Sequence, residues 1–147
     1  MNSTEPGRSS GEFLRKVELS FDRAEIEGVQ SDVARELAAR SFDEGAAFAV
    51  RLAIEEALVN GFRHGNGGDL SKTVHFECAI TDRSICIEVV DQGPGFDPSG
   101  VPDPTDEENL EVPSGRGIML MRAYMSEVDF LPPGNRVRML YIREQTG

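Results

Sequence analysis

The regular patterning of the chain begins with an alternation of apolar and polar residues over 16–21, which predicts a strand with one buried face. Its apolar members are Val17, Leu19 and Phe21. Apolar residues then recur at helical spacing over 26–40 and over 44–63, so two amphipathic helices are expected. The candidate helix caps are Asp22, paired with Glu25 in a capping box, ahead of the first helix, and Ser41 or Asp43 ahead of the second.

Residues 76–91 alternate so regularly that the pattern predicts a hairpin together with its register. With a tight turn at 82–83, the opposed apolar pairs are Ile80 with Ile85, Cys78 with Ile87, and Phe76 with Val89. Asp91 continues the phase of the second strand, so its carboxylate is expected to point between sheet and helices, where a buried charge needs a partner. Cys86 lies on the opposite face from Cys78, which argues against a disulfide between them.

Beyond the hairpin, the pattern predicts a long connection, one helix and two strands. The run Gln-Gly-Pro-Gly-Phe at 92–96 allows a sharp turn. Residues 97–114 are rich in Pro, Gly and acid and contain no Lys or Arg, which favours a mobile lid. A helix is expected over 118–125, and strands over 127–131 and 136–142. The helix residues expected in the core are Met119, Leu120, Met121 and Met125.

Composition narrows the class of protein. The 147 residues fit a single domain over 13–147, preceded by a tail at 1–12 that is too polar to order. Twenty-six acidic against fifteen basic residues give a net charge of −11, which argues against direct binding of nucleic acid or of an anionic membrane. No apolar run approaches the roughly 20 residues of a membrane span, and the tail lacks a signal-peptide region, so a cytoplasmic protein is expected.

A polar stripe interrupts the otherwise apolar second helix. At about 3.6 residues per turn, Glu56, Asn60 and His64 recur at four-residue steps and share one face beside the core. A carboxylate, an amide and an imidazole in this position suit a polar ligand. The alternative is a glutamate paired with Arg63 or His64, followed by ordinary helix-ending Asn and Gly residues.

Two further signals follow in chain order: Asp91 stands ahead of Gly93 and Gly95, and a helix start is flanked by Gly115 and Gly117. A carboxylate accepts from the exocyclic amine of a base, glycine-lined backbone approaches phosphates closely, and an amide oxygen suits magnesium. In combination these signals predict a nucleotide site. Taken singly, each signal is weak: the glycines also suit ordinary turns, and the Asp91 carboxylate also suits a cap of the turn that follows it.

These motifs resemble those of the GHKL ATPase superfamily, which has the Bergerat nucleotide-binding fold. Residues 56–60 resemble its N-box, 91–95 its first glycine box and 115–117 its second. The likeness covers about residues 16–143 and implies an α+β two-layer sandwich, with a mixed, mostly antiparallel sheet and helices on one face. The phrases E-E-A-L-V-N-G-F-R-H-G and G-I-M-L-M-R-A-Y-M-S-E-V-D are most similar to anti-sigma-factor serine/threonine kinases of bacterial partner-switching systems.

Matching positions imply roles for single residues. Asn60 corresponds to the ligand of Mg²⁺, Glu56 to the general base that acts on the attacking hydroxyl, and Asp91 to the acceptor of the adenine amino group. Glu55 is the weaker base candidate, because it precedes Asn60 by five residues and points about 140° away. The residues implied in backbone approach to the nucleotide are Gly93, Gly95, Gly115 and Gly117.

The roles of Arg63, His64 and Arg116 stay open between a phosphate contact and a place at a helix end or in solvent. The likeness implies a kinase that uses ATP and Mg²⁺ to phosphorylate a STAS-type anti-sigma-factor antagonist, that otherwise sequesters a sigma factor, and that forms a homodimer. Because residues 97–114 offer the γ-phosphate no basic side chain, the alternative is an ATP-gated protein-binding regulator with little kinase activity. A histidine kinase catalytic domain is less favoured, because no dimerising hairpin with a phosphoacceptor His accompanies the motifs.

Overall fold

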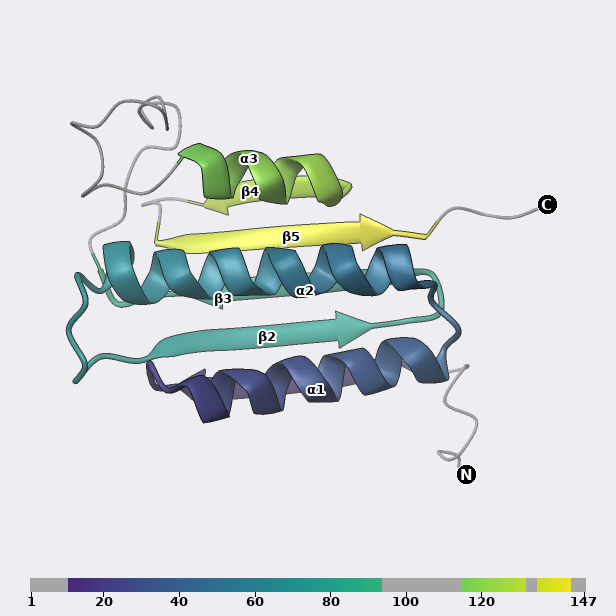
Figure 1. The fold of residues 1–147 in the computed structure, drawn as a ribbon, viewed down its shortest axis with the longest axis horizontal. Helices are drawn as coiled ribbons and strands as arrows, with labels where there is room; N and C mark the ends of the chain where they lie inside the picture. The colour runs from purple at the N-terminus through teal and green to yellow at the C-terminus, as the bar shows by residue number, and fades with distance from the viewer. Residues whose placement is uncertain (1–10, 94–114, 132–134, 144–147) are drawn as a thin grey trace.

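The computed structural model describes residues 11–93, 115–131 and 135–143. Within these ranges the chain forms two layers, a β-sheet and the helices that cover one of its faces (Figure 1). The helices are α1 (Arg23–Ala39), α2 (Glu44–Val59) and α3 (Gly115–Tyr124), and α2 continues into a π-helical turn, η2 (Asn60–Gly65). Helix α2 contacts both α1 and α3, so it is the central element of the helical layer.

The sheet has the strand order β1-β2-β3-β5-β4, and each of its four pairings is antiparallel. Its strands are β1 (Phe13–Leu19), β2 (Val74–Ile80), β3 (Ser84–Val90), β4 (Glu127–Leu131) and β5 (Arg136–Ile142). The predicted two-layer α+β sandwich with helices on one face is therefore confirmed. The expected bounds of β4 and β5 agree with the structure.

The hairpin β2–β3 has the register that its alternation predicts. The opposed pairs are Ile80 with Ile85, Cys78 with Ile87, and Phe76 with Val89. These six side chains are almost completely buried, and the residues between them face the other side of the sheet. Cys78 and Cys86 are both free thiols on opposite faces, as expected. This register brings Asp91 to the end of β3 on the side of the helices.

Both predicted helix caps are present. Asp22 Oδ1 accepts from the Ala24 backbone N–H at 3.0 Å, and Asp43 Oδ1 accepts from that of Ala46 at 2.8 Å. The capping box of α1 differs from the expected one, because the Glu25 carboxylate accepts from the backbone N–H of Ser20 rather than from that of Asp22. The contact joins the first turn of α1 to the residue that follows β1.

Three predicted details of the elements were wrong. Strand β1 begins at Phe13 and ends at Leu19, so Phe21 leaves the sheet and stacks on the ring of Phe62 with 4.8 Å between ring centroids. Helix α3 begins at Gly115, three residues earlier than expected, and ends at Tyr124. Met119 is 57% exposed, whereas Met121 and Met125 are buried in the core.

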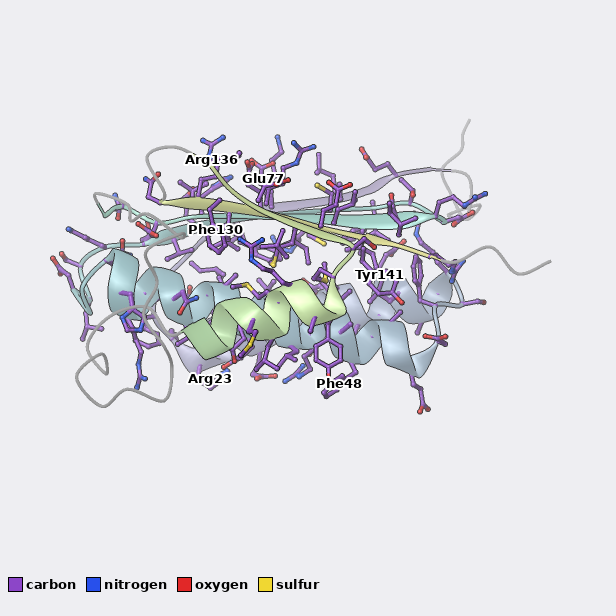
Figure 2. All side chains as sticks on the ribbon, turned by 90° about the horizontal axis from the view of Figure 1, so that it is seen from above. Arg23, Phe48, Glu77, Phe130, Arg136 and Tyr141 are labelled. Carbon is purple, nitrogen blue, oxygen red and sulfur yellow. The ribbon has the colours of Figure 1, made fainter. Side chains whose placement is uncertain are left out.

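The core lies between the sheet and the helices, and the far face of the sheet is open. Figure 2 shows Phe130 between the two layers, Glu77 on the open face, and Phe48 on the outer side of the helices. Core residues such as Ile54 and Ile87 are fully buried. Each such side chain contributes about 1.5–3 kcal/mol relative to an exposed one, so the buried layer accounts for most of the driving force for folding.

A buried arginine joins α1 to the β2–β3 turn. The Arg40 side chain is 2% exposed, and it pairs with Glu36 at 2.8 Å and with Asp82 at 3.0 Å. Arg143 extends the cluster by donating to the backbone carbonyl oxygens of Asp82 and Arg40. The cluster satisfies a buried charge at the end of α1 and fixes the turn of the hairpin against that helix.

The predicted tail at 1–12 and the predicted lid at 97–114 fall largely or wholly outside the described residues, and both stay predictions. Among the helices that the structure describes, none combines the length and the apolar character needed to cross a membrane.

Candidate nucleotide-binding site

A small cleft lies where the C-terminal end of α2 meets the end of β3 and helix α3. The three elements reach the same end of the molecule in Figure 1. The apolar lining residues of the cleft are Ala57, Val89, Met121, Phe130 and Val137, and its polar ones include Asn60, Asp91 and Asn135. The cleft therefore combines apolar walls with a few polar groups.

The last turn of the α2–η2 helix is widened, which the sequence pattern did not predict. The Asn66 N–H donates to the Gly61 carbonyl oxygen at 2.8 Å, a bond that spans five residues. Such single π-helical turns are frequent at functional sites. Gly61 packs against Val74 so closely that a Cβ atom there would lie 3.2 Å from a Val74 methyl group. The turn thus rests directly on the first residue of β2.

The face of this helix that lines the cleft is offset by one residue from the predicted polar stripe. Ala57, Gly61 and Gly65 line the cleft at four-residue steps, and Asn60 lines it beside them. Glu56 and His64 are half-buried next to this face and are not among its lining residues. The structure therefore brings Asn60 and Asp91 together at one cleft and leaves Glu56 and His64 at its margin.

The side-chain amide of Asn60 is buried, and its Nδ2 atom has no hydrogen-bond partner among the described residues. Buried polar groups in native proteins are nearly always paired, and an exception inside a cleft indicates a missing ligand or water. The described residues contain no group of three or more His, Cys, Asp or Glu that could hold a metal ion. A magnesium ion here would be held by the oxygen of the Asn60 amide together with phosphate oxygens and water, which suits this ion, whereas Nδ2 is a donor and would need an acceptor.

The two consecutive glutamates of α2 have different surroundings. Burial, followed by the nearby charge of Glu55, raises the pKa of Glu56 above its ordinary value. Glu55 lies on the outer side of the helix, where the Arg23 guanidinium donates to both of its oxygens at 3.2 and 3.3 Å. Glu55 is thus occupied in a surface ion pair, whereas Glu56 is a carboxylate of raised pKa near the cleft.

The backbone around Asp91 is tightly held. The Asp91 N–H donates to the Asn135 carbonyl oxygen at 2.9 Å, and the Asp91 carbonyl oxygen accepts from Asn135 Nδ2 at 3.0 Å. Burial raises the pKa of the Asp91 carboxyl, and the hydrogen bond from the Gly93 N–H to Oδ1 partly offsets this. The carboxylate therefore lines the cleft from a fixed backbone position.

Two glycines allow the end of β3 to touch the η2 turn. A Cβ atom on Gly65 would lie 2.1 Å from Asp91 Oδ2, and one on Gly93 would lie 1.7 Å from the Gly65 carbonyl oxygen. Both distances are far below any real contact, so a side chain at either position would separate the two segments. Gly93 thus lies directly against Gly65, and its approach to a nucleotide stays a prediction.

The second glycine box forms the first turn of α3, since this helix begins at Gly115. Its N-terminal end lies at the same end of the molecule as the cleft (Figure 1), and Met121, two turns on, lines the cleft. The backbone N–H groups of a helix start favour an anion. Gly95 and the side chain of Arg116 lie outside what the structure describes.

Sequence reasoning missed Gly65, Asn66 and Asn135 as parts of this site. The sequence patterns assigned neither Asn66 nor Asn135 a role in the site. Asn66 accepts from the backbone N–H of Gln92, which lies 26 residues away in sequence. Asn135 donates to the backbone carbonyl oxygen of Asp91, which lies 44 residues away. The local signals were the Gly and Asn residues at the end of the N-box helix and the Asn directly before β5.

Comparison with known proteins supports the motif assignment. A model of the family described as histidine kinase-like ATPase domain matches residues 19–141. The anti-sigma F factor of Oceanobacillus iheyensis is 26% identical over 99 residues, which cover 65% of this chain and 67% of the relative. The anti-sigma F factor of Clostridium perfringens is 28% identical over 99 residues, with 65% and 70% covered.

A third relative is named as an enzyme. The serine/threonine-protein kinase BtrW of Bordetella bronchiseptica is 27% identical over 85 residues, which cover 56% of this chain and 60% of the relative. The three relatives thus include proteins named for sigma-factor control and one named for phosphoryl transfer to Ser or Thr.

Proposed function

The chain belongs to the family of histidine kinase-like ATPase domains, and on that premise we propose that it is an ATP-binding anti-sigma-factor serine/threonine kinase. It phosphorylates a STAS-type anti-sigma-factor antagonist and otherwise sequesters a sigma factor. The observation that carries this proposal is that Asn60 and Asp91 line the same cleft. The Nδ2 atom of Asn60 has no hydrogen-bond partner there among the described residues. The anti-sigma F factors and the kinase among its relatives support the choice of partners.

In this proposal, Asp91 recognises the adenine base. Its carboxylate accepts from the 6-amino group of adenine, while the apolar walls formed by Val89, Met121 and Val137 accommodate the ring. Guanine has a carbonyl oxygen in place of that amine, so it would leave the carboxylate without a donor. The predicted adenine contact of Asp91 is supported by its place at the cleft and by the fixed backbone that carries it.

Asn60 and the start of α3 receive the phosphates. Magnesium, when bound, neutralises the charge that develops on the phosphoryl oxygens. Asn60 contributes an amide to its coordination, and the backbone N–H groups at Gly115 and Gly117 face the anion. The assignment of Gly93 and Gly95 to backbone approach around the nucleotide is part of the same proposal.

Glu56 prepares the attacking hydroxyl group. The serine oxygen of the antagonist forms a bond to the γ-phosphorus, the bond from that phosphorus to ADP breaks, and the serine proton passes to the Glu56 carboxylate. A pKa raised by burial brings this group closer to neutral pH, which suits a general base. Glu55 does not suit this role, because both of its oxygens accept from the Arg23 guanidinium and it lies on the outer surface.

Transfer of labelled γ-phosphate tests the proposal. Purified protein, Mg-ATP and a STAS-type antagonist should give label on a serine of the antagonist. Glu56→Gln should lower the rate by at least about 100-fold, as loss of a general base does. Glu55→Gln is the matched control on the neighbouring position and should keep the wild-type rate. Equal rates in the two variants would remove Glu56 from catalysis.

A second function is favoured by one sequence feature. The stretch 97–114 contains no Lys or Arg that could stabilise charge on the γ-phosphate. In this alternative, ATP binding only selects which protein partner is held, and little phosphoryl transfer occurs. ATP-dependent exchange of sigma factor and antagonist that is unchanged in Glu56→Gln, without label on the antagonist, would support this alternative and reject the kinase.

A further inference from the structure

Asn66 follows the η2 turn, and its side chain is buried between separate segments of the chain, with 3% of the residue exposed. Its Nδ2 donates to the Thr73 carbonyl oxygen at 3.0 Å, and its Oδ1 accepts from the Gln92 backbone N–H at 2.7 Å. An amide suits this pair of contacts, because its NH2 group donates and its oxygen accepts. The amide therefore ties the end of the η2 turn to the start of β2 and to the residue after Asp91.

The peptide unit between Asp91 and Gln92 is held on both sides by asparagine amides. Its carbonyl oxygen accepts from Asn135 Nδ2 at 3.0 Å, and its N–H donates to Asn66 Oδ1 at 2.7 Å. A peptide unit is planar, so fixing both of its polar groups fixes its rotation. The Asp91 N–H is also bonded, to the Asn135 carbonyl oxygen. The direction in which the Asp91 side chain leaves the backbone is therefore set by Asn66 and Asn135.

Backbone conformation does not explain the asparagine at position 66. Asparagine is often found after a helix because it tolerates the left-handed conformation, but Asn66 has φ −84° and ψ −3°, which any residue adopts. The bond from Nδ2 to Thr73 and the bond from Gln92 to Oδ1 are the contacts specific to its side chain. Its amide is thus the feature that distinguishes it from other residues at this site.

We propose that Asn66 is a positioning residue for base recognition: it orients the Asp91–Gln92 peptide so that the Asp91 carboxylate faces the 6-amino group of adenine. The inference rests on the proposed function and extends it to a residue that does not itself touch the nucleotide. Without the amide, the peptide is free to rotate and the carboxylate, which lies against Gly65, loses its fixed direction. Selectivity for adenine then falls, while contacts to ribose and phosphates remain.

The test compares two nucleotides that differ only in the 6-amino group: ATP and purine riboside triphosphate, which lacks it. Wild-type protein should bind ATP at least about tenfold more tightly, as expected for a hydrogen bond to a charged group. Asn66→Ala should lower that ratio by roughly fivefold or more, with little change in affinity for the purine analogue. Ser71→Ala is the control in the same connection, because the bond of the Ser71 hydroxyl within the described ranges is to Asp69, and it should keep the ratio.

A structural role alone would weaken both nucleotides equally, so an unchanged ratio in Asn66→Ala would overturn the inference while the kinase proposal stood. A wild-type protein with no preference for ATP over the analogue would overturn the adenine contact and the inference together. Asn66→Asp keeps the acceptor for Gln92, so it provides the comparison if Asn66→Ala does not fold, and it should retain more of the ratio. In wild-type protein without nucleotide, the Gln92 amide should be protected from hydrogen exchange, and unprotected exchange would also overturn the inference.

Discussion

Gly65→Ala tests whether the close contact between the η2 turn and Asp91 sets the nucleotide site. The added methyl carbon would lie 2.1 Å from Asp91 Oδ2 and 2.2 Å from Cγ, whereas ordinary contacts begin at 3.4 Å. Relief of this overlap requires a movement of about 1.3 Å, because close-packed atoms cannot interpenetrate. The Asp91 backbone is held by Asn135, so the carboxylate is the part that moves. A hydrogen bond of about 2.9 Å that lengthens by this amount is broken.

The expected result is a loss of about 1–3 kcal/mol in ATP binding, or roughly 5- to 150-fold in the dissociation constant. Calorimetric titration with Mg-ATP measures it, with circular dichroism to establish that the variant is folded. Gly28→Ala is the matched control, since apart from the chain neighbours and backbone of α1 itself, no atom of the described residues lies within 4 Å of the added methyl group. It should keep ATP affinity and stabilise the protein by up to about 1 kcal/mol through helix propensity. A folded Gly65→Ala protein that binds ATP within twofold of wild type would refute the reasoning.

Three further predictions concern stability and reactivity. Arg40→Ala should destabilise the protein by about 3–5 kcal/mol in urea unfolding, because it removes the buried cation of the ion pair with Glu36, and a change below about 1 kcal/mol would contradict this. Hydrogen bonds to Glu77, then to Glu18, raise the pKa of His75, so its contribution to stability is complete below pH 6.5 and is lost as pH rises through the folded-state value. His75→Gln should abolish that part of the dependence of thermal unfolding on pH, and an unchanged profile would count against it. Burial raises the pKa of Cys78 to about 12, so iodoacetamide at pH 8 should leave Cys78 unmodified until the protein unfolds, and mass spectrometry would detect earlier labelling.

The sequence by itself determined the elements whose signals are local. The alternation over 76–91 specified the β2–β3 register, because a slip by one residue would turn every apolar side chain to the open face. Asp22 and Asp43 marked the helix starts, because their side chains bond backbone groups two or three residues away. The three motifs also identified Asn60 and Asp91, which the structure brings to one cleft.

Only the tertiary structure decided the surroundings of those two residues. The π-helical turn, the offset of the cleft-lining face, and the contact between Gly65 and Asp91 all depend on how closely α2 packs on β2 and β3. Asn66 binds across 26 residues of sequence, and Asn135 across 44. Periodicity reports which face of a single element is buried, but it carries no information about which backbone group another element places opposite. The sequence therefore indicated Asn60 and Asp91 as members of the site, and packing between elements determined which residues surround them.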